Sequence, residues 1–345
     1  MNPSSILIQV LRGQLVESRH TAHLAIVNEA GRLLYECGDP HLLTFIRSSA
    51  KPLQALPVVE TGAASRYRFG DRELALICSS HNGEPAQVQL VEEMLARIGL
   101  SAAALQCGVQ KPAYKPAADE LYRSSQSPGA LHNTCSGKHG GMLALSQLLG
   151  ADHQHYTNIE HPVQQIMLKT VAEMSGTDPA SIPLGVDGCG VPVFGLHLTH
   201  LAYAYARWGR PERLSSTRAQ ACRSLIAAIT AEPYYLAGSE RYDTRLVEVT
   251  QGKVIGKMGA EGVFALTLPD KGWGLALKIT DGSERALYPA VTEVLRQLGA
   301  LNEDQCRELS AYHQPLIKNK AGTVVGRIEA QAPIREVCVD LFSAR

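Results

Sequence analysis

The order of the periodic segments most constrains what this chain can fold into. Apolar runs typical of strands occur near both ends, and amphipathic runs typical of helices fill the middle. This pattern suits one antiparallel sheet assembled from both ends, with the middle forming a separate lobe. The sequence therefore predicts an α+β fold, in which an antiparallel sheet is built from N- and C-terminal strands and a helical lobe is inserted.

The predicted boundaries follow from these segments. A single domain covers 1–345, with a sheet lobe at 1–80 and 245–345 and a helical lobe at 81–244. A hairpin is expected around 28–31, and later strands at 254–257, 262–268, 274–279 and 323–328. Helices are expected at 85–98, 139–149, 163–174, 216–229 and 290–298. The weakly patterned stretch 111–129, rich in Pro, Ala and Ser, predicts a flexible loop.

Composition narrows the class of protein. Lys+Arg and Asp+Glu each total 33, so the formal net charge is zero, which argues against binding to nucleic acid or to an anionic membrane. No apolar run reaches the length of a membrane span. The first residues lack the features of a leader peptide, and the eight cysteines include no C-x-x-C pair. We therefore expect a cytoplasmic protein with reduced thiols, and a homodimer on base rates.

The segment Ser48-Ser49-Ala50-Lys51 carries the first chemical signal. A serine hydroxyl is a poor nucleophile at neutral pH and needs a base within hydrogen-bond reach. A lysine one helical turn later can be that base if it gives up its proton. Pro52 is tolerated in a first helical turn, so Ser48 is expected at a helix N-terminus, where its N–H can help to hold an oxyanion. The motif alone is more typical of a helix cap followed by a solvated lysine.

A second segment, Ser80-His81-Asn82, precedes a predicted helix. It is typical of a capping turn, and by itself that interpretation is at least as good as a functional one. The functional interpretation makes Ser80 a relay that passes protons from a lysine to the departing amine. His81 and Asn82 are then candidate substrate-binding residues.

A third segment, Lys257-Met258-Gly259, ends a predicted strand. Its glycine lets a ligand approach the backbone, and Lys257 is a second cation that would depress the pKa of Lys51. The order S-x-x-K, S-x-N, K-x-G resembles that of the serine β-lactamases and penicillin-binding proteins, which use a serine to attack an amide.

Two further segments bring cysteines beside glycines, Cys135-Ser136-Gly137-Lys138-His139 and Asp187-Gly188-Cys189-Gly190. The first lacks the leading glycine and the final Ser/Thr of a phosphate loop, so nucleotide binding is rejected. Cys135 and Cys189 could hold zinc with Lys138, His139 or Asp187, form a disulfide, or pack as buried thiols. From the residues alone, buried thiols or a disulfide is the simpler interpretation.

Taken together, the chain resembles the L-asparaginase II family, the thermolabile rhizobial-type asparaginases. The resemblance rests on segments spread from residue 16 to about 330: Val16–His20, Arg47–Pro57, Ser80–Pro85, Cys135–His139, Val186–Pro192, Arg241–Thr244 and Gly259–Val263. It implies hydrolysis of L-asparagine to L-aspartate and ammonia, and a fold like the serine β-lactamase/transpeptidase group and the serine-dependent glutaminases.

The resemblance also implies roles for particular residues. It carries over two Ser–Lys pairs, Ser48 with Lys51 and Ser80 with Lys257, as the catalytic residues. It carries over an accessory zinc site to Cys135, Lys138 and Cys189. This raises zinc above the disulfide, although a zinc-bound lysine has to be neutral. Thr134 departs from the asparagine expected before the cysteine, which puts substrate affinity in doubt.

The predicted reaction is acyl transfer to Ser48, with oxyanion donors from Ser48 and near Gly259. Free asparagine is zwitterionic, so its carboxylate and ammonium also need partners. Arg47 is the candidate for the first, and Asp187 or Glu261 for the second. The alternatives are a serine-dependent glutaminase or other amidase, a metallohydrolase with zinc on Cys135, His139 and Cys189, and an amino-acid-binding protein without turnover.

Overall fold

The computed structural model describes residues 5–342. Within them the chain divides into two compact units, which we call the sheet unit and the helical unit. The sheet unit contains the residues up to Ser49, Gly195–Arg210 and those from Arg245 onward, and the helical unit contains Ala50–Phe194 and Pro211–Thr244. Residues 1–4 and 343–345 lie outside the described residues. The predicted sheet lobe includes both stretches, and the expectation about a leader peptide concerns the first of them.

The sheet unit takes its strands from both ends of the chain. They are β1 (Ile6–Arg12), β2 (Leu15–Asn28), β3 (Arg32–Cys37), β4 (Leu43–Phe45), β7 (Ile255–Gly259), β8 (Val263–Leu268), β9 (Trp273–Ile279), β10 (Leu316–Lys318), β11 (Val324–Gln331) and β12 (Arg335–Asp340). Its helices are α8 (Leu198–Gly209), α12 (Glu284–Gln297), α13 (Glu303–Glu308), α14 (Ser310–His313) and the 3-10 turn η5 (Pro269–Lys271). Three elements run across the unit boundary in sequence: η1 (Arg47–Ala50), β6 (Pro192–His197) and α11 (Tyr242–Thr250).

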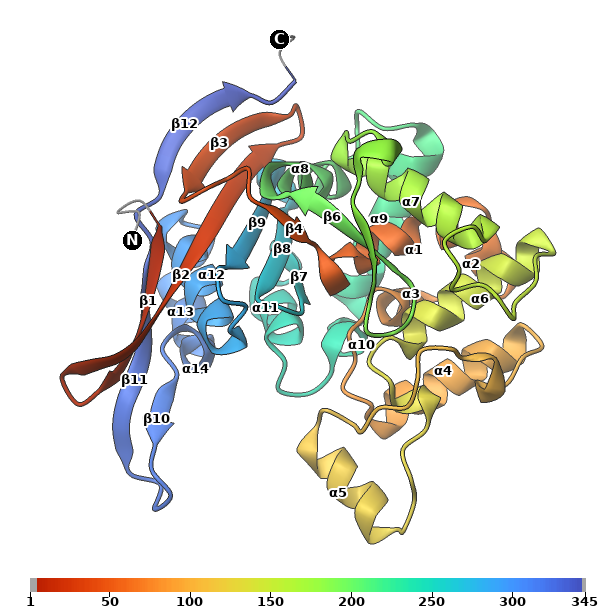
Figure 1. Ribbon diagram of the computed structural model, residues 1–345, viewed down its shortest axis with the longest axis horizontal. Helices are drawn as coiled ribbons and strands as arrows, with labels where there is room; N and C mark the ends of the chain where they lie inside the picture. The colour runs from red at the N-terminus through yellow and green to blue at the C-terminus, as the bar shows by residue number, and fades with distance from the viewer. Residues whose placement is uncertain (1–4, 343–345) are drawn as a thin grey trace. The chain divides into compact units, whose positions relative to one another are not determined.

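The strand order confirms the predicted fold class. The N-terminal strand β1 pairs antiparallel with the C-terminal β11 on one side and with β2 on the other. The long β2 continues to β9, and the order β2-β9-β8-β7 completes the sheet (Figure 1). The far half of β2 also pairs with β3, which in turn pairs with β12. The hairpin expected around residues 28–31 is the β2–β3 connection.

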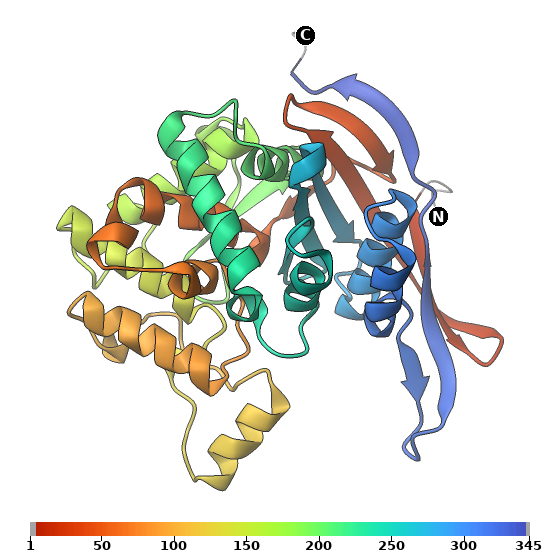
Figure 2. The same ribbon diagram turned by 180° about the vertical axis from the view of Figure 1, so that it is seen from behind.

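Helices cover both faces of the central strands. The residues of β7 and β8 are buried throughout, so neither face of these strands meets water. The backbone of α8 lies against Gly274, whereas Tyr288 of α12 makes a ring contact with Phe264. Gly274 and Phe264 belong to opposite faces, because Phe264 pairs with Leu277 and successive side chains of a strand alternate. Figure 2 shows α12 lying over the sheet.

The helical unit is built around α1 (Lys51–Glu60), whose residues from Lys51 to Val58 are all buried. It packs against α6, α7 and α9. The other elements are α2 (Ala63–Arg66), α3 (Asp71–Ile77), α4 (Pro85–Arg97), η2 (Ala102–Ala104), α5 (Lys115–Arg123), η3 (Ala130–His132), α6 (Ser136–Leu149), α7 (Pro162–Ser175), η4 (Pro179–Ser181), β5 (Leu184–Val186), α9 (Ser216–Ala231) and α10 (Pro233–Ala237).

The lobe boundary predicted at residue 80 is corrected to Ser49/Ala50. Residues 51–58 of α1 are all buried, the polar Lys51 and Gln54 included, so the helix lacks the exposed polar face that identifies a surface helix. The predicted helical lobe also included 195–210, which belongs to the sheet unit because α8 packs on β9. The expected loop at 111–129 contains α5, which starts at Lys115 with Pro116 in its first turn, where proline is favoured.

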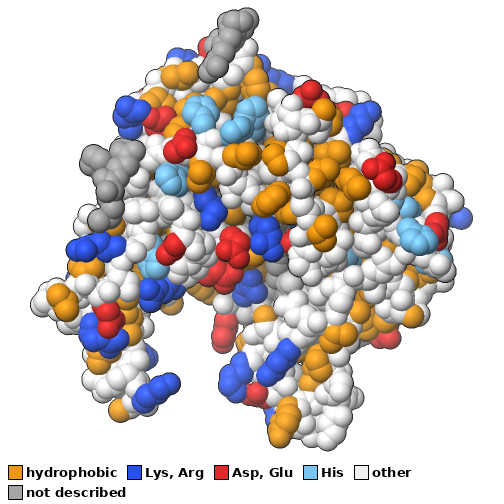
Figure 3. Space-filling model, viewed as in Figure 1, with side chains coloured by type: hydrophobic (Ala, Val, Ile, Leu, Met, Phe, Trp, Pro, Cys, Tyr) orange, Lys and Arg blue, Asp and Glu red, His pale blue; other side chains and the backbone are white. Residues whose placement is uncertain are grey.

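The surface agrees with the balanced composition. On the face drawn in Figure 3, basic and acidic side chains are interspersed. No helix within residues 5–342 combines the length and the apolar character that crossing a bilayer demands.

One buried carboxylate gives a test of the sheet unit. Glu293 on α12 accepts hydrogen bonds from Arg296, Gln297 and His313. Burial raises the pKa of Glu293, but these hydrogen bonds outweigh it and lower the pKa from 4.5 to about 2. Because the folded pKa is depressed, the stabilisation is present above about pH 4.5 and is lost as the pH falls towards 2.

We therefore expect Glu293→Gln to lower the free energy of unfolding by about 1–3 kcal/mol at pH 7, and by much less at pH 3. Urea unfolding at both pH values measures this. The control is Glu308→Gln, which removes an ion pair between two exposed side chains, Glu308 and Arg245, and should change stability little. An equal loss for Glu293→Gln at both pH values would contradict the assignment.

Candidate active site

The Ser48 segment forms a tight turn at the end of β4. Arg47 has φ 49°, the left-handed region that non-glycine residues rarely occupy, and η1 then leads directly into α1. Ser49 is buried, and its hydroxyl donates to Ile46 O at 2.6 Å. Ser48 is half-buried, and its hydroxyl has no hydrogen-bond partner in the described part of the chain. Of the adjacent serines, Ser48 is therefore the one left open to a substrate.

The third sequence segment lies against this turn. A Cβ added to Gly259 on β7 would lie 2.8 Å from Ile46 O and 3.2 Å from Ser49 N, so only glycine allows this approach. Lys257, two residues earlier, is 1% exposed, and its Nζ donates to Met258 O at 2.9 Å. The sheet unit thus brings the Ser48 turn and the strand carrying Lys257 together.

The first and second segments meet in the helical unit. Lys51, the first residue of α1, has no exposed surface. Its Nζ donates to Ser80 Oγ at 2.9 Å, to Ser79 O at 2.5 Å and to Thr134 O at 3.4 Å. Lys51 therefore contacts Ser80, a pair that differs from the two predicted Ser–Lys pairs. Thr134, noted in the sequence for its side chain, takes part through its backbone carbonyl.

His81 has both ring nitrogens engaged by the protein. Its Nδ1 accepts from Gly83 N at 3.1 Å, so Nε2 carries the proton. Nε2 lies 2.8 Å from Ser136 Oγ, which donates its own proton to Leu131 O. Burial, together with the positive charge of Lys51, lowers the pKa of His81 to about 3. The neutral His81 ring thus connects the Ser80 segment to Ser136 at the start of α6. Its predicted role in substrate binding stays a prediction.

The other predicted substrate residues lie in turns or in internal networks. Asn82 is buried and hydrogen-bonded to Glu84, Ser239 and Arg241. Asp187 starts the tight turn between β5 and β6, where its Oδ1 accepts from Gly188 N. Glu261 lies exposed in the β7–β8 turn with φ 64°. Their roles as ligands for substrate are not decided by these contacts.

The two cysteine segments lie against each other in the helical unit. Cys135, Lys138 and Cys189 are buried, and Lys138 Nζ donates to Cys189 Sγ at 3.2 Å. A hydrogen bond from Cys189 lowers the pKa of the Cys135 thiol and raises that of Cys189 itself. Burial opposes the charge on Lys138, but the two sulfurs raise its pKa.

These three side chains offer a zinc ion two sulfurs and one nitrogen. No group of three His, Cys, Asp or Glu side chains able to hold a metal occurs in residues 5–342. Sulfur and nitrogen are the donors that zinc prefers, and a fourth ligand would have to come from solvent or substrate. The set fits zinc on the condition that Lys138 releases its proton, because an ammonium has no lone pair to donate.

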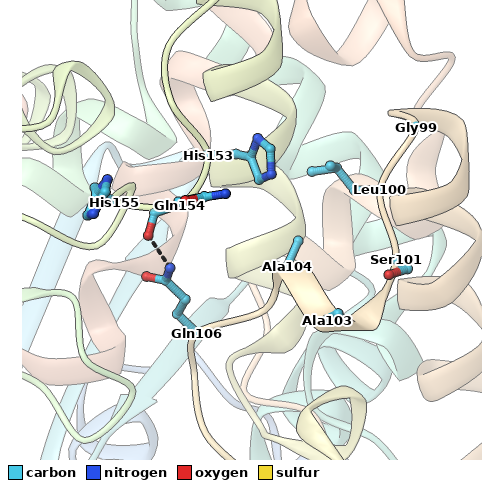
Figure 4. A pocket seen from close by; sticks show the side chains of 9 residues that line it. All are labelled: Gly99, Leu100, Ser101, Ala103, Ala104, Gln106, His153, Gln154 and His155. Atoms are coloured by element: carbon cyan, nitrogen blue, oxygen red, sulfur yellow. Dashed lines mark hydrogen bonds between the residues drawn. The ribbon is translucent and has the colours of Figure 1, made fainter.

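A hollow of about 810 Å³ lies elsewhere on the helical unit. The residues that line it are Gly99–Ser101, Ala103, Ala104, Gln106 and His153–His155, and Gln106 donates to the backbone of Gln154 across it (Figure 4). It contains none of the predicted catalytic residues, so cavity size alone does not identify the site.

A model of the L-asparaginase II family matches residues 8–330 of the chain. The chain belongs to this family. The match confirms the family that the spaced segments indicate, and it covers both the Ser48 turn and the Lys257 strand. Among curated proteins, no match to this L-asparaginase II member was found.

Several solved structures are similar to this chain. Mglu in its native form in 4.3 M NaCl has a TM-score of 0.42 and 15% identity, covering 84% of this chain and 60% of Mglu. A β-lactamase from Mycobacterium bovis has a TM-score of 0.42 and 16% identity, with 81% and 95% covered. The D-alanine carboxypeptidase AmpC from Burkholderia cenocepacia has a TM-score of 0.37 and 12% identity, with 81% and 93% covered. The chain thus spans about 60% of the length of Mglu.

The environment of His81 predicts how the stability of this protein depends on pH. The unfolded chain takes up a proton at His81 near pH 6.5, whereas the folded protein does so only near pH 3. Stability should therefore fall as the pH drops from about 6.5 towards 3. His81→Gln should be less stable than wild type at pH 7 but should lose less stability between pH 7 and pH 5. Urea unfolding measures both, and a ring NMR signal of His81 that titrates near pH 6.5 would contradict the prediction.

Proposed function

We propose that the protein hydrolyses the side-chain amide of L-asparagine to L-aspartate and ammonia through a β-aspartyl ester on Ser48. Membership of the L-asparaginase II family supports an amidohydrolase. The observation that carries the proposal is the contrast within one turn. Ser49 Oγ is buried and bonded, while the half-buried Ser48 leaves its hydroxyl uncommitted three residues before the buried Lys51.

The first half of the reaction forms the ester. A neutral Lys51, which keeps two of the three N–H donations described above and has its nitrogen lone pair free, takes the proton of the Ser48 hydroxyl, and the serine oxygen attacks the amide carbon. The carbonyl oxygen becomes an oxyanion, which backbone N–H groups of Ser48 and of the segment near Gly259 stabilise. The carbon–nitrogen bond then breaks. Ammonia leaves with a proton passed through Ser80, whose hydroxyl already accepts from Lys51 at 2.9 Å, and Lys257 supports this transfer.

The second half releases the product. Water attacks the β-aspartyl ester, its proton passes to the same lysine–serine pair, and Ser48 regains a proton as aspartate leaves. From the sequence alone, Arg47 is the candidate partner of the substrate carboxylate, and Asp187 or Glu261 is the candidate partner of its ammonium group.

Ser80 is the competing nucleophile, because a lysine amine lies within hydrogen-bond distance of its hydroxyl. Ser80 is only 4% exposed, however, whereas Ser48 is half-buried. An attacking oxygen must reach the substrate carbon, so Ser48 is the better candidate. A glutaminase would use the same chemistry on a side chain one methylene longer, and comparing glutamine with asparagine as substrate separates the two.

We also propose that zinc binds Cys135, Lys138 and Cys189 as an accessory ion. When bound, zinc would neutralise the thiolate charge and fix the two cysteine segments relative to each other. A homodimer and a cytoplasmic location stay predictions from the sequence.

Replacing each of the two adjacent serines by alanine tests whether Ser48 is the nucleophile. Ser48→Ala should lower kcat for asparagine by at least about 1,000-fold and leave the melting temperature unchanged. Ser49→Ala is the matched control. It should keep turnover but lose about 1 kcal/mol of stability with its hydrogen bond to Ile46 O. Ammonia release gives kcat, and mass spectrometry of quenched enzyme should find the acyl adduct on the Ser48 peptide. An adduct on the Ser80 peptide instead would reverse the assignment.

Elemental analysis tests the zinc proposal. Protein purified without added metal should contain about one zinc per chain, and Cys135→Ser or Cys189→Ser should lose it. Cys222→Ser, which changes a buried cysteine of α9, should retain the zinc. Metal-free protein whose Cys135 and Cys189 react with alkylating reagents as ordinary thiols would exclude the site.

A further inference from the structure

The loop after α10 is tied to the segment that follows Ser80. Gly238 has φ 106°, and a Cβ there would lie 2.4 Å from Glu84 Oε1. The next residue, Ser239, donates to Glu84 through both its backbone N–H and its hydroxyl, each at 2.7 Å. The loop is therefore held rigidly before it reaches Arg241.

Asn82 connects this loop to Arg241. Its amide nitrogen donates to Ser239 O at 2.8 Å and to Glu84 Oε1 at 3.1 Å. These acceptors fix the orientation of the amide, because the nitrogen must face them. Its oxygen consequently points away from them and accepts from Arg241 Nη1 at 3.0 Å. Asn82 is thus a positioning residue for a guanidinium group.

Arg241 has a neutral partner but no counter-charge. A guanidinium has five N–H donors, and in residues 5–342 Arg241 forms the hydrogen bond to Asn82 and no ion pair within 4.0 Å. Glu84 is the carboxylate of the same network, but Asn82, Ser239 and Tyr234 already donate to it. A half-buried cation without an anionic partner carries a desolvation cost that a bound anion would offset.

The position of Arg241 relates it to the proposed chemistry. Asn82 lies two residues after Ser80, the residue whose hydroxyl accepts from Lys51. His81 lies between Ser80 and Asn82 in sequence. The positive charge of Arg241 contributes to the lowering of the pKa of His81. A planar guanidinium held by one edge presents its remaining N–H groups in the geometry that a carboxylate accepts in two parallel hydrogen bonds.

We propose that Arg241, oriented by Asn82, binds the α-carboxylate of the amino-acid substrate. This deepens the proposed function, on which it rests, and it gives a role to the Arg241–Thr244 segment that the mechanism does not use. It also assigns the carboxylate to a residue other than Arg47. The site would accept α-amino acids with a side-chain amide and would discriminate against analogues in which the carboxylate is a neutral amide.

The experiment compares L-asparagine with L-asparagine amide, which keeps the side-chain amide but has a carboxamide in place of the α-carboxylate. In wild type, kcat/KM should favour L-asparagine by on the order of 100-fold. Arg241→Gln should lower kcat/KM for L-asparagine by a similar factor, mainly through KM, and leave the value for the amide within about threefold. Arg241→Lys should keep part of the preference, because the charge stays while the fork geometry is lost.

Arg245→Gln is the matched control. Arg245 lies four residues later, is 40% exposed and pairs with Glu248 and Glu308, so both kinetic values should match wild type. An equal fall on both substrates in Arg241→Gln, with an unchanged melting temperature, would overturn the carboxylate assignment. So would full discrimination in Arg241→Gln together with its loss in Arg47→Gln.

A binding measurement separates this inference from the proposed function. Calorimetry should show that wild type binds L-aspartate and that Arg241→Gln binds it at least about 100-fold more weakly. Wild type that binds L-aspartate through Arg241 but releases no ammonia from L-asparagine would support the anchor and refute the asparaginase. Equal binding of L-aspartate by wild type and Arg241→Gln would overturn the anchor whatever the turnover.

Discussion

A lysine side chain shielded completely from solvent connects three segments that are far apart in sequence. Lys51 Nζ reaches Ser79 and Ser80 after α3 and Thr134 before α6, and each is contacted through an oxygen. Burying an amine is unfavourable unless its N–H groups are satisfied, so the surrounding backbone must hold these oxygens in place. The buried helix α1, which starts at Lys51 and packs against α6, α7 and α9, provides that support. The arrangement of the helical unit and the position of Ser80 thus depend on the same contacts.

The Ser48–Lys51 motif is divided along the chain at one peptide bond, where the two compact units meet in sequence. The sheet unit ends its first stretch at Ser49, after the turn that Gly259 accommodates, and the helical unit begins at Ala50, one residue before Lys51. Serine and lysine of the same short motif therefore receive their surroundings from different parts of the fold. A left-handed Arg47 on one side and a helix N-terminus on the other hold this short connection in a defined conformation.

Patterns with clear periodicity predicted the fold well. Apolar runs on either side of the turn at residues 28–31, and apolar runs separated by glycine-rich turns in β7 to β9, located the sheet, and the segment order identified its assembly from both ends. The stretch 51–77 was assigned to the sheet lobe, because α1 is buried from Lys51 to Val58 and lacks the exposed polar face by which a surface helix is recognised. The spacing of the segments identified the candidate residues, but it did not predict which of them contact one another. The contact of Lys51 with Ser80, and that of Asn82 with Arg241, join positions 29 and 159 residues apart, which only the tertiary fold can bring together.

The strand β12 has a consequence for any work at the carboxyl end of the chain. It pairs with β3 and forms the outermost strand at that side, with an interrupted register and with Arg335, Glu336 and Asp340 along it. Irregular pairing and charged side chains discourage another chain from adding to an open border. Removing β12 would expose the backbone N–H and C=O groups of β3 that pair with it. Variants truncated before β12 should then be prone to aggregation. The strand β12 thereby protects one edge of the sheet from association, although it lies far in sequence from the Ser48 turn.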